Sequence, residues 1–157
     1  MQNLKIFRNS RVIITGHNGF KGSWLTEWLY QLCANVMGIS LDLPTYPSHF
    51  RASKINLGIK DVRLDIRNKK KLEKKITSFK PDFVFHLAAQ SLVGLSYKNP
   101  TITWQTNVFG TLNILESIRK LKNVCNVVII TSDKCYFNRE IHYGYKETDI
   151  LGGRDPY

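Results

Sequence analysis

The sequence predicts an α/β fold built on a doubly wound parallel sheet. Short, nearly all-apolar segments rich in β-branched residues alternate with longer segments whose apolar residues recur at helical spacing. Such apolar segments are typical of parallel strands that helices cover on both faces. The chain has 157 residues, about the length of one domain. Because sheets of this kind bind ligands at the carboxyl ends of their strands, the residues that follow each strand are the candidates for a functional site.

The first part of the chain predicts two strands and one helix. β-Branched runs predict strands at residues 11–15 and 35–40, and a helix is expected between them at residues 22–33. Two prolines among polar residues predict an irregular excursion over residues 43–58. The apolar stripe of the helix consists of Trp24, Leu25, Trp28, Leu29 and Leu32.

The rest of the chain continues the alternation. Strands are predicted at residues 62–65, 82–88 and 126–131, and helices at residues 68–79 and 100–121. Beyond the last strand the periodicity is lost and glycines enter. The residues expected to face inward from these two helices are Leu72, Ile76, Phe79, Val108, Leu112, Leu115 and Ile118.

The charge of the chain is strongly positive, with 23 Lys and Arg against 12 Asp and Glu and a formal net charge of +11. Such an excess is typical of proteins that bind nucleic acid or anionic membranes. Much of it, however, lies in residues 67–80, where seven basic residues accompany one acid. Most of these lie off the apolar stripe of the predicted helix, so we interpret them as a solvated face and expect no nucleic-acid partner.

The cysteine count and the apolar segments bear on location. Three cysteines without a C-x-x-C pair indicate neither a disulfide framework nor a metal cluster, and they fit a reducing cytoplasm. No apolar run approaches the ~20 residues that span a bilayer, so we expect no membrane partner.

A glycine-rich turn follows the first strand, with the sequence T-G-H-N-G-F-K-G. Gly16 would permit the sharp turn, Gly19 would let the backbone approach a pyrophosphate, and Gly22 would let helix and sheet touch. Amides at the helix start would then bind the anion. Asp42 lies where an acid can bind the ribose hydroxyls of NAD, although a solvated loop residue would look the same. A structural turn without a cofactor is the alternative for the whole segment.

The spacing G-x-x-G-x-x-G resembles the extended short-chain dehydrogenase/reductase superfamily. The heptad G-H-N-G-F-K-G is similar to the G-H-T-G-F-K-G of CDP-glucose 4,6-dehydratases, with Asn18 in place of the usual Thr. Segments 23–29, 86–91, 106–111, 131–136 and 152–157 resemble the same family. The resemblance implies an NAD-dependent reaction on CDP-glucose that yields a 4-keto-6-deoxy sugar nucleotide, a precursor for bacterial surface polysaccharides.

The resemblance also implies residue roles in cofactor binding. Lys21 would add a cation to the amide cradle, although an exposed first-turn lysine is the alternative. Asp65 and Ile66 would contact the adenine edge, and Asn107 would hold the fourth strand against the active site. The full set implied for the cofactor is Gly16, Asn18, Gly19, Phe20, Lys21, Gly22, Asp42, Asp65, Ile66, Leu87, Ala88, Ala89, Gln90 and Asn107.

Four residues match the catalytic positions of the family. Ser132 would hydrogen-bond the C4 oxygen of the sugar, and Asp133 would protonate the departing C6 hydroxyl, which requires a pKa raised by burial. Lys134 would take the C5 proton or stabilise the enolate as a fixed charge. Tyr157 aligns with the tyrosine of a Y-x-x-x-K pair that deprotonates the C4 hydroxyl. Without the resemblance, Ser132 to Lys134 would be interpreted as a helix cap.

The resemblance implies that residues 1–157 are the N-terminal part of an NAD-binding domain whose remaining strands and substrate domain are absent from this chain. We therefore predict that the chain alone is inactive and binds NAD weakly. The resemblance also implies a homodimer formed through two long helices per subunit. The chain has only the helix at 100–121, so the expectation of a homodimer applies to the full-length family and is in doubt for this chain alone. The alternatives are another sugar-nucleotide epimerase or dehydratase, and a non-catalytic fragment that binds NAD or a polyanion.

Overall fold

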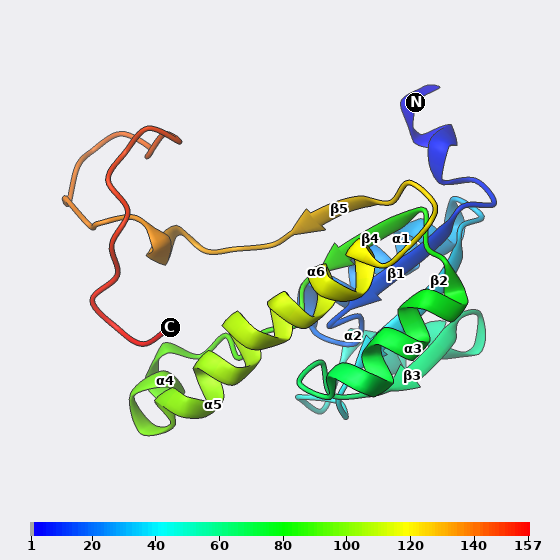
Figure 1. Ribbon diagram of the computed structural model, residues 1–157, viewed down its shortest axis with the longest axis horizontal. Coiled ribbons are helices and arrows are strands. Elements are labelled where there is room, and N and C mark those ends of the chain that lie inside the picture. The colour runs from blue at the N-terminus through cyan, green and yellow to red at the C-terminus, as the bar shows by residue number, and fades with distance from the viewer. Residues whose placement is uncertain (1) are drawn as a thin grey trace.

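The computed structural model describes residues 2–157 and contains a five-stranded parallel sheet (Figure 1). The strand order is β3-β2-β1-β4-β5, and every neighbouring pair is parallel. This confirms the predicted doubly wound α/β, Rossmann-like fold. The strands are β1 (Arg11–Thr15), β2 (Asn35–Ser40), β3 (Lys60–Arg63), β4 (Phe83–His86) and β5 (Asn126–Ile129).

The order of the strands locates the expected binding crevice. From β1 the chain builds outward through β2 to β3, and then returns to place β4 on the other side of β1. Ligands of such sheets bind at the carboxyl ends of the strands where the order reverses, which here is between β1 and β4. The glycine turn follows β1 and residues 87–90 follow β4, so both segments border this point.

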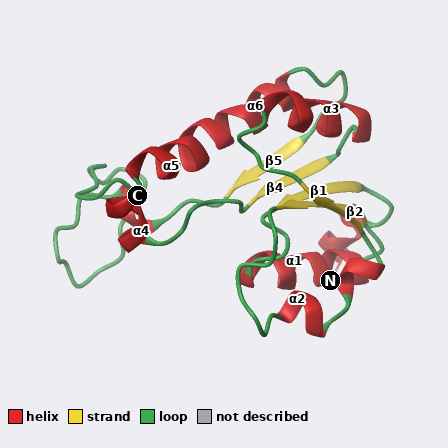
Figure 2. Ribbon diagram, turned by 90° about the horizontal axis from the view of Figure 1, so that it is seen from below, coloured by secondary structure: helices red, strands yellow, loops and turns green. Residues whose placement is uncertain are grey.

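Helices cover the two faces of the sheet (Figure 2). On one face lie α1 (Phe20–Gln31) and α2 (His49–Ala52). On the other lie α3 (Lys69–Phe79) and a long helical segment made of α5 (Pro100–Trp104), the π-helical segment η3 (Gln105–Gly110) and α6 (Thr111–Arg119).

The core therefore has two halves, and successive residues of β1 enter opposite ones. Ile13 packs with Leu72, Ile76 and Ile114 from α3 and α6. Val12 and Ile14 face the other way and pack with Leu29 of α1, among others.

Short helices appear where the sequence predicted none. The excursion at residues 43–58 contains α2 and the 3-10 turn η2 (Ile55–Leu57), which bury Phe50 and Ile55. Residues after β4 form α4 (Val93–Lys98), and 3-10 turns lie at η1 (Gln2–Phe7) and η4 (Asp133–Cys135). The expectation of irregular structure at 43–58 was therefore wrong. Helices this short could not be predicted because they have too few residues to display a helical period.

The inward faces of two helices were predicted correctly only in part. Of the stripe predicted for α1, Leu29 is buried and Leu25 and Leu32 pack against the core, but Trp24 and Trp28 are exposed, and α1 buries Gly22, Ser23 and Thr26 in addition. Val108, Leu112 and Leu115 are likewise exposed, while Gly110, Ile114 and Ser117 face the sheet. The small Gly110 allows the helical segment to approach the loop after β3 closely, since a Cβ at Gly110 would lie 2.5 Å from Cδ1 of Ile66. The π-helical segment also shifts the register of the predicted stripe.

The last part of the chain extends away from the sheet (Figure 1). Beyond β5 it contains η4 and one isolated bridge between Tyr136 and Leu151, so the predicted loss of periodicity is confirmed. Among residues 2–157, no helix is long and apolar enough to cross a membrane.

Candidate cofactor and active site

The glycine turn has the geometry that its spacing predicts. Gly16 has a φ of 73°, a conformation that favours glycine, and a Cβ there would lie 2.8 Å from the backbone nitrogen of Ala88. A Cβ at Gly22 would lie 2.0 Å from the carbonyl oxygen of Gly16. Gly19 is the N-cap of α1 and makes no side-chain cap bond, so the free amides of the first turn remain available to an anion. Phe20 and Lys21 are exposed at this helix start.

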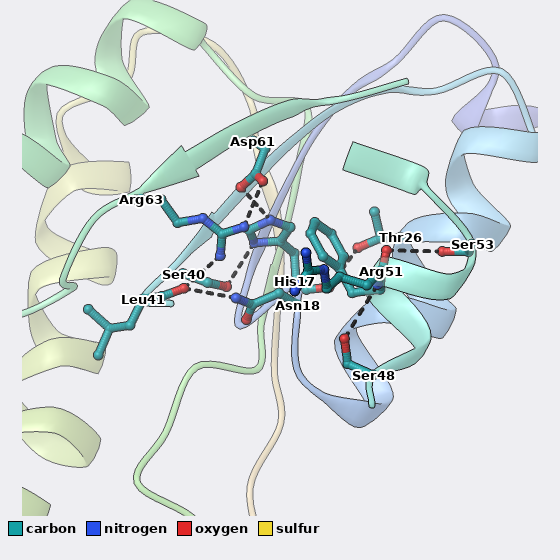
Figure 3. A network of polar contacts seen from close by, with 11 residues as sticks. His17, Asn18, Thr26, Ser40, Leu41, Ser48, Arg51, Ser53, Asp61 and Arg63 are labelled. Carbon is teal, nitrogen blue, oxygen red and sulfur yellow. Dashed lines mark hydrogen bonds and ion pairs between the residues drawn. The ribbon is translucent and has the colours of Figure 1, made fainter. Parts of the chain in front are cut away.

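His17 lies inside the glycine turn and is completely buried (Figure 3). Its Nε2 lies 3.0 Å from Oδ1 of Asp61, and its Nδ1 lies 2.7 Å from Oγ of Ser40. Burial lowers the pKa of His17, although Asp61 acts in the opposite direction. Since the carboxylate only accepts, Nε2 of the neutral ring donates to Asp61 and Nδ1 accepts from Ser40. His17 therefore anchors the turn to β2 and β3, and its side chain has no polar atom left for a phosphate.

Asn18 and Arg63 complete this network around the end of β2. Nδ2 of Asn18 donates to the carbonyl of Leu41 over 2.8 Å, and a guanidinium nitrogen of Arg63 donates to the same carbonyl over 2.7 Å. Arg63 also pairs with Asp61 at 2.7 Å. Asn18 thus fixes the turn rather than presenting its amide to a ligand. Asp61 and Arg63 were not singled out from the sequence, because only the pairing of β3 with β2 brings them under the turn.

The segment after β4 is held by Asn107. Its Oδ1 accepts the Gln90 amide proton over 2.8 Å, and its Nδ2 donates to the Gln90 carbonyl over 3.0 Å. This is the structural role that the resemblance implies for Asn107. Ala88 and Ala89 lie in this segment, where small side chains leave space beside the crevice.

The acids expected near adenosine differ in their surroundings. Asp42 is exposed just beyond the end of β2. Asp65 accepts hydrogen bonds from Arg67, the shortest 2.6 Å, and these lower the pKa of its carboxyl. The side chain of Ile66 is buried in the core, so only its backbone can face a ligand. A hollow of about 500 Å³ lies beside this segment, lined by Arg67, Gln105, Phe109 and Asn113. The only sign of this hollow in the sequence is that Gln105, Phe109 and Asn113 are spaced four residues apart.

Ser132, Asp133 and Lys134, which match catalytic positions of the family, form a corner after β5 in which Asp133 and Lys134 are exposed to solvent. Oγ of Ser132 caps η4 by accepting the Lys134 amide proton and donates to Asp133 over 3.2 Å. Nζ of Lys134 lies 3.1 Å from Oδ2 of Asp133, whose side chain is 77% exposed. The hydrogen bond from Lys134 lowers the pKa of Asp133, so the expectation of a carboxyl raised by burial was wrong for this chain. Within residues 2–157 the side chain of Asp133 remains mostly exposed, and the neighbouring charge of Lys134 favours its ionised form.

The backbone amide of Tyr157 donates a hydrogen bond to Oδ1 of Asp155 over 2.9 Å. The end of the chain lies beside α4 (Figure 1), where the Tyr97 hydroxyl donates to the carbonyl of Arg154 over 3.4 Å. Within residues 2–157, no hydrogen bond joins Tyr157 to Ser132, Asp133 or Lys134. The structure thus brings the glycine turn and the segment after β4 together, and it joins Ser132, Asp133 and Lys134 by hydrogen bonds, but it does not join Tyr157 to them.

This fold and glycine turn define a Rossmann-type dinucleotide-binding domain. The family model for GDP-mannose 4,6 dehydratase matches residues 13–157, and the chain belongs to this family. It is 50% identical over 151 residues to a CDP-glucose 4,6-dehydratase of Salmonella typhimurium, covering 96% of this chain and 42% of that protein. It is 34% identical to a CDP-paratose 2-epimerase of Salmonella typhi, covering 88% of this chain and 41% of that protein. The chain thus spans less than half the length of these relatives.

Solved structures agree with the fold. An epimerase from Methanothermobacter thermautotrophicus superimposes with a TM-score of 0.82 at 26% identity, covering 100% of this chain and 46% of the other. A UDP-glucose 4-epimerase from Thermus thermophilus, in complex with NAD, gives a TM-score of 0.79 at 27% identity, with 94% and 46% covered.

Proposed function

We propose that the chain is the cofactor-binding part of an NAD-dependent CDP-glucose 4,6-dehydratase, with the catalytic and substrate machinery completed by further sequence. The observation that carries the proposal is the glycine turn, in which Gly16 and Gly22 occupy positions that exclude a Cβ. The 50% identity to a CDP-glucose 4,6-dehydratase supports this substrate over other sugar nucleotides. Residues 1–157 would then form the first part of the NAD-binding domain.

The residues present fit NAD. The amides at the start of α1 would bind the pyrophosphate, helped by the charge of Lys21. Gly19 would let the backbone approach it, and Asp42 would accept hydrogen bonds from the ribose hydroxyls. Bound NAD would accept a hydride from C4 of the sugar and later return it to C6.

The chain's own residues would handle the protons. Tyr157 would remove the proton of the C4 hydroxyl while Ser132 hydrogen-bonds the C4 oxygen. Asp133 would protonate the departing C6 hydroxyl as water is lost across C5 and C6, and Lys134 would take the C5 proton or stabilise the enolate. Asp133 is ionised and exposed here, so this role requires a cover that raises its pKa. We therefore propose that residues 1–157 alone are inactive.

Calorimetric titration with NAD tests the cofactor assignment. We expect weak binding by the unmodified chain and a loss of that binding in Gly19→Ala, whose methyl group would meet the pyrophosphate. The backbone of Gly19 suits any residue (φ −72°), and a Cβ there would lie 3.3 Å from the carbonyl oxygen of Gly16, a contact that a shift of a few tenths of an ångström relieves, so the variant should fold. Gly94→Ala is the matched control, because a Cβ there meets nothing within 4 Å. Equal binding by the Gly19 variant and the control would refute the assignment, and a low-micromolar constant for the unmodified chain would refute the expectation of weak binding.

A chimera tests the reaction. Residues 1–157 would replace the matching part of the Salmonella typhimurium relative, and formation of the 4-keto-6-deoxy product from CDP-glucose would be followed with NAD present. We expect activity in the chimera and its loss in Asp133→Asn. A folded chimera that binds NAD and CDP-glucose but forms no product would contradict the proposal.

An epimerase is the second candidate, because a CDP-paratose 2-epimerase is 34% identical and epimerases are among the structural relatives. The paired Asp133 and Lys134 favour the dehydratase, since an epimerase needs no acid to expel the C6 hydroxyl. We also propose a cytoplasmic location, which the three free cysteines of the described residues support.

A further inference from the structure

A buried chain of hydrogen bonds passes through β4 and links β1 to the start of α6. At its centre is His86, whose ring lies between Thr15 and Thr111 and is only 2% exposed. Nδ1 lies 2.6 Å from Oγ1 of Thr15, and Nε2 lies 2.8 Å from Oγ1 of Thr111. Both ring nitrogens are therefore satisfied inside the protein.

The partners of the two threonines fix the direction of every bond. Oγ1 of Thr111 donates its single proton to the carbonyl of Asn107 over 2.7 Å, so it must accept from Nε2–H of His86. Burial lowers the pKa of His86 to about 4, which keeps the ring neutral and leaves Nδ1 as an acceptor for the Thr15 hydroxyl. Oγ1 of Thr15 in turn accepts the amide proton of Ala88 over 3.2 Å. The opposite tautomer would take the Thr111 proton away from the Asn107 carbonyl.

Both ends of this chain reach the same short segment. One end is the amide of Ala88, and the other is Asn107, whose side chain holds the amide and carbonyl of Gln90. At the end of the π-helical segment the backbone amide of Thr111 donates to the carbonyl of Val108, and the Thr111 hydroxyl donates to the carbonyl of Asn107.

We propose that His86 is a positioning residue for residues 88–90, the segment along which NAD would lie. Held as the Nε2–H tautomer, it couples the Ala88 amide to the Asn107 clamp, so the shape of this segment depends on the Thr111 hydroxyl. The link to NAD rests on the function proposed above, whereas the positioning itself is a property of the cofactor-free chain.

Ring nitrogen resonances of the 157-residue chain, labelled with ¹⁵N-histidine and measured without NAD at neutral pH, report the tautomer directly. His86→Gln identifies the His86 signals by their absence. We expect a protonated Nε2 and an unprotonated Nδ1 for His86. A protonated Nδ1, or averaging between the two forms, would overturn the proposal whether or not any variant folds.

Amide hydrogen exchange then tests the coupling. Thr111→Val removes the hydroxyl at nearly constant shape, and we expect Gln90 to exchange roughly tenfold faster, the equivalent of one buried hydrogen bond. Thr111→Ser should restore slow exchange. Thr77→Val is the matched control, because its hydroxyl makes the same bond to the carbonyl four residues earlier (2.7 Å) in α3.

Ile13, in the core, reports global opening in the same spectra. Gln90 exchange in Thr111→Val that matches the unmodified chain, or that rises only in step with Ile13, would overturn the proposal. If NAD fails to bind while the tautomer and the exchange rates are as expected, the cofactor assignment fails and the positioning role stands.

Discussion

Gly38 of β2 lies directly against the buried ring of His17, and Gly38→Ala tests how rigidly that ring is held. The new Cβ would lie 2.2 Å from Cδ2 and 2.3 Å from Cγ of His17. The strand cannot yield easily, because Gly38 is paired with Ile14 of β1 on one side and with Asp61 of β3 on the other. The ring must therefore move.

Moving the ring breaks its bonds to Ser40 and Asp61, each contributing about 1 kcal/mol. Overpacking adds about 1–3 kcal/mol. We expect Gly38→Ala to lower the free energy of unfolding by about 3–5 kcal/mol, a large share of the ~5–15 kcal/mol typical of a domain. Urea unfolding followed by circular dichroism measures this as a lower midpoint at unchanged slope.

Removing the ring first should abolish most of this cost. In a His17→Ala background the added methyl group enters the space that the imidazole left, so the cost of Gly38→Ala should fall to less than about 1 kcal/mol. The reasoning is refuted if the two substitutions add within about 0.5 kcal/mol, because the methyl group and the ring would then not compete for the same space.

Three further outcomes are expected from urea unfolding. The buried ring of His86 has a pKa lowered to about 4, so the unfolded chain binds a proton that the folded chain does not. The free energy of unfolding should therefore fall as the pH drops from about 6.5 to 4, by up to about 1.4 kcal/mol per pH unit for this ring, and the lowered pKa of His17 acts in the same direction below pH 6.5. A profile equally steep in His86→Gln would contradict this. Lys80→Gly should raise the free energy of unfolding by about 0.5–1 kcal/mol, because Lys80 caps the end of α3 with a φ of 51°, a conformation that favours glycine. A lower free energy of unfolding in this variant would be evidence against strain at Lys80. Ile76→Ala, in the core between α3 and the sheet, should lower the free energy of unfolding by about 2–5 kcal/mol. A decrease of less than about 1 kcal/mol would mean that α3 is loosely packed.

The strands could be predicted more closely than the helix faces. β1 and β2 have the predicted limits, because β-branched runs between turn residues have few alternative conformations. The inward face of η3 and α6 could not be predicted, because it includes Gly110 and Ser117, and the small size of Gly110 matters only because Ile66 lies against it. Hydrophobic periodicity alone does not show where a small residue allows such a close contact.

The candidate site also contains some features that the sequence predicted and others that it could not predict. The roles of Gly16 and Gly22 follow from backbone conformation and local spacing, which the sequence carries. The surroundings of His17 and Asp133 depend on groups distant in sequence or on the lack of cover, so neither the Asp61 partner nor the lowered pKa of Asp133 was visible beforehand. Solvent exposure, and contacts between residues that are distant in sequence, are determined only by the assembled fold.

The two edges of the sheet differ in their tendency to associate. β3 forms one edge and carries Lys60, Asp61 and Arg63, and charged side chains discourage another strand from pairing there. β5 forms the other edge with the sequence N-V-V-I and no charge, and Val128 is exposed. Any strand that extends this sheet, from further sequence or from a second copy, will therefore add beside β5. A charged side chain introduced into β5 should keep the purified chain from aggregating.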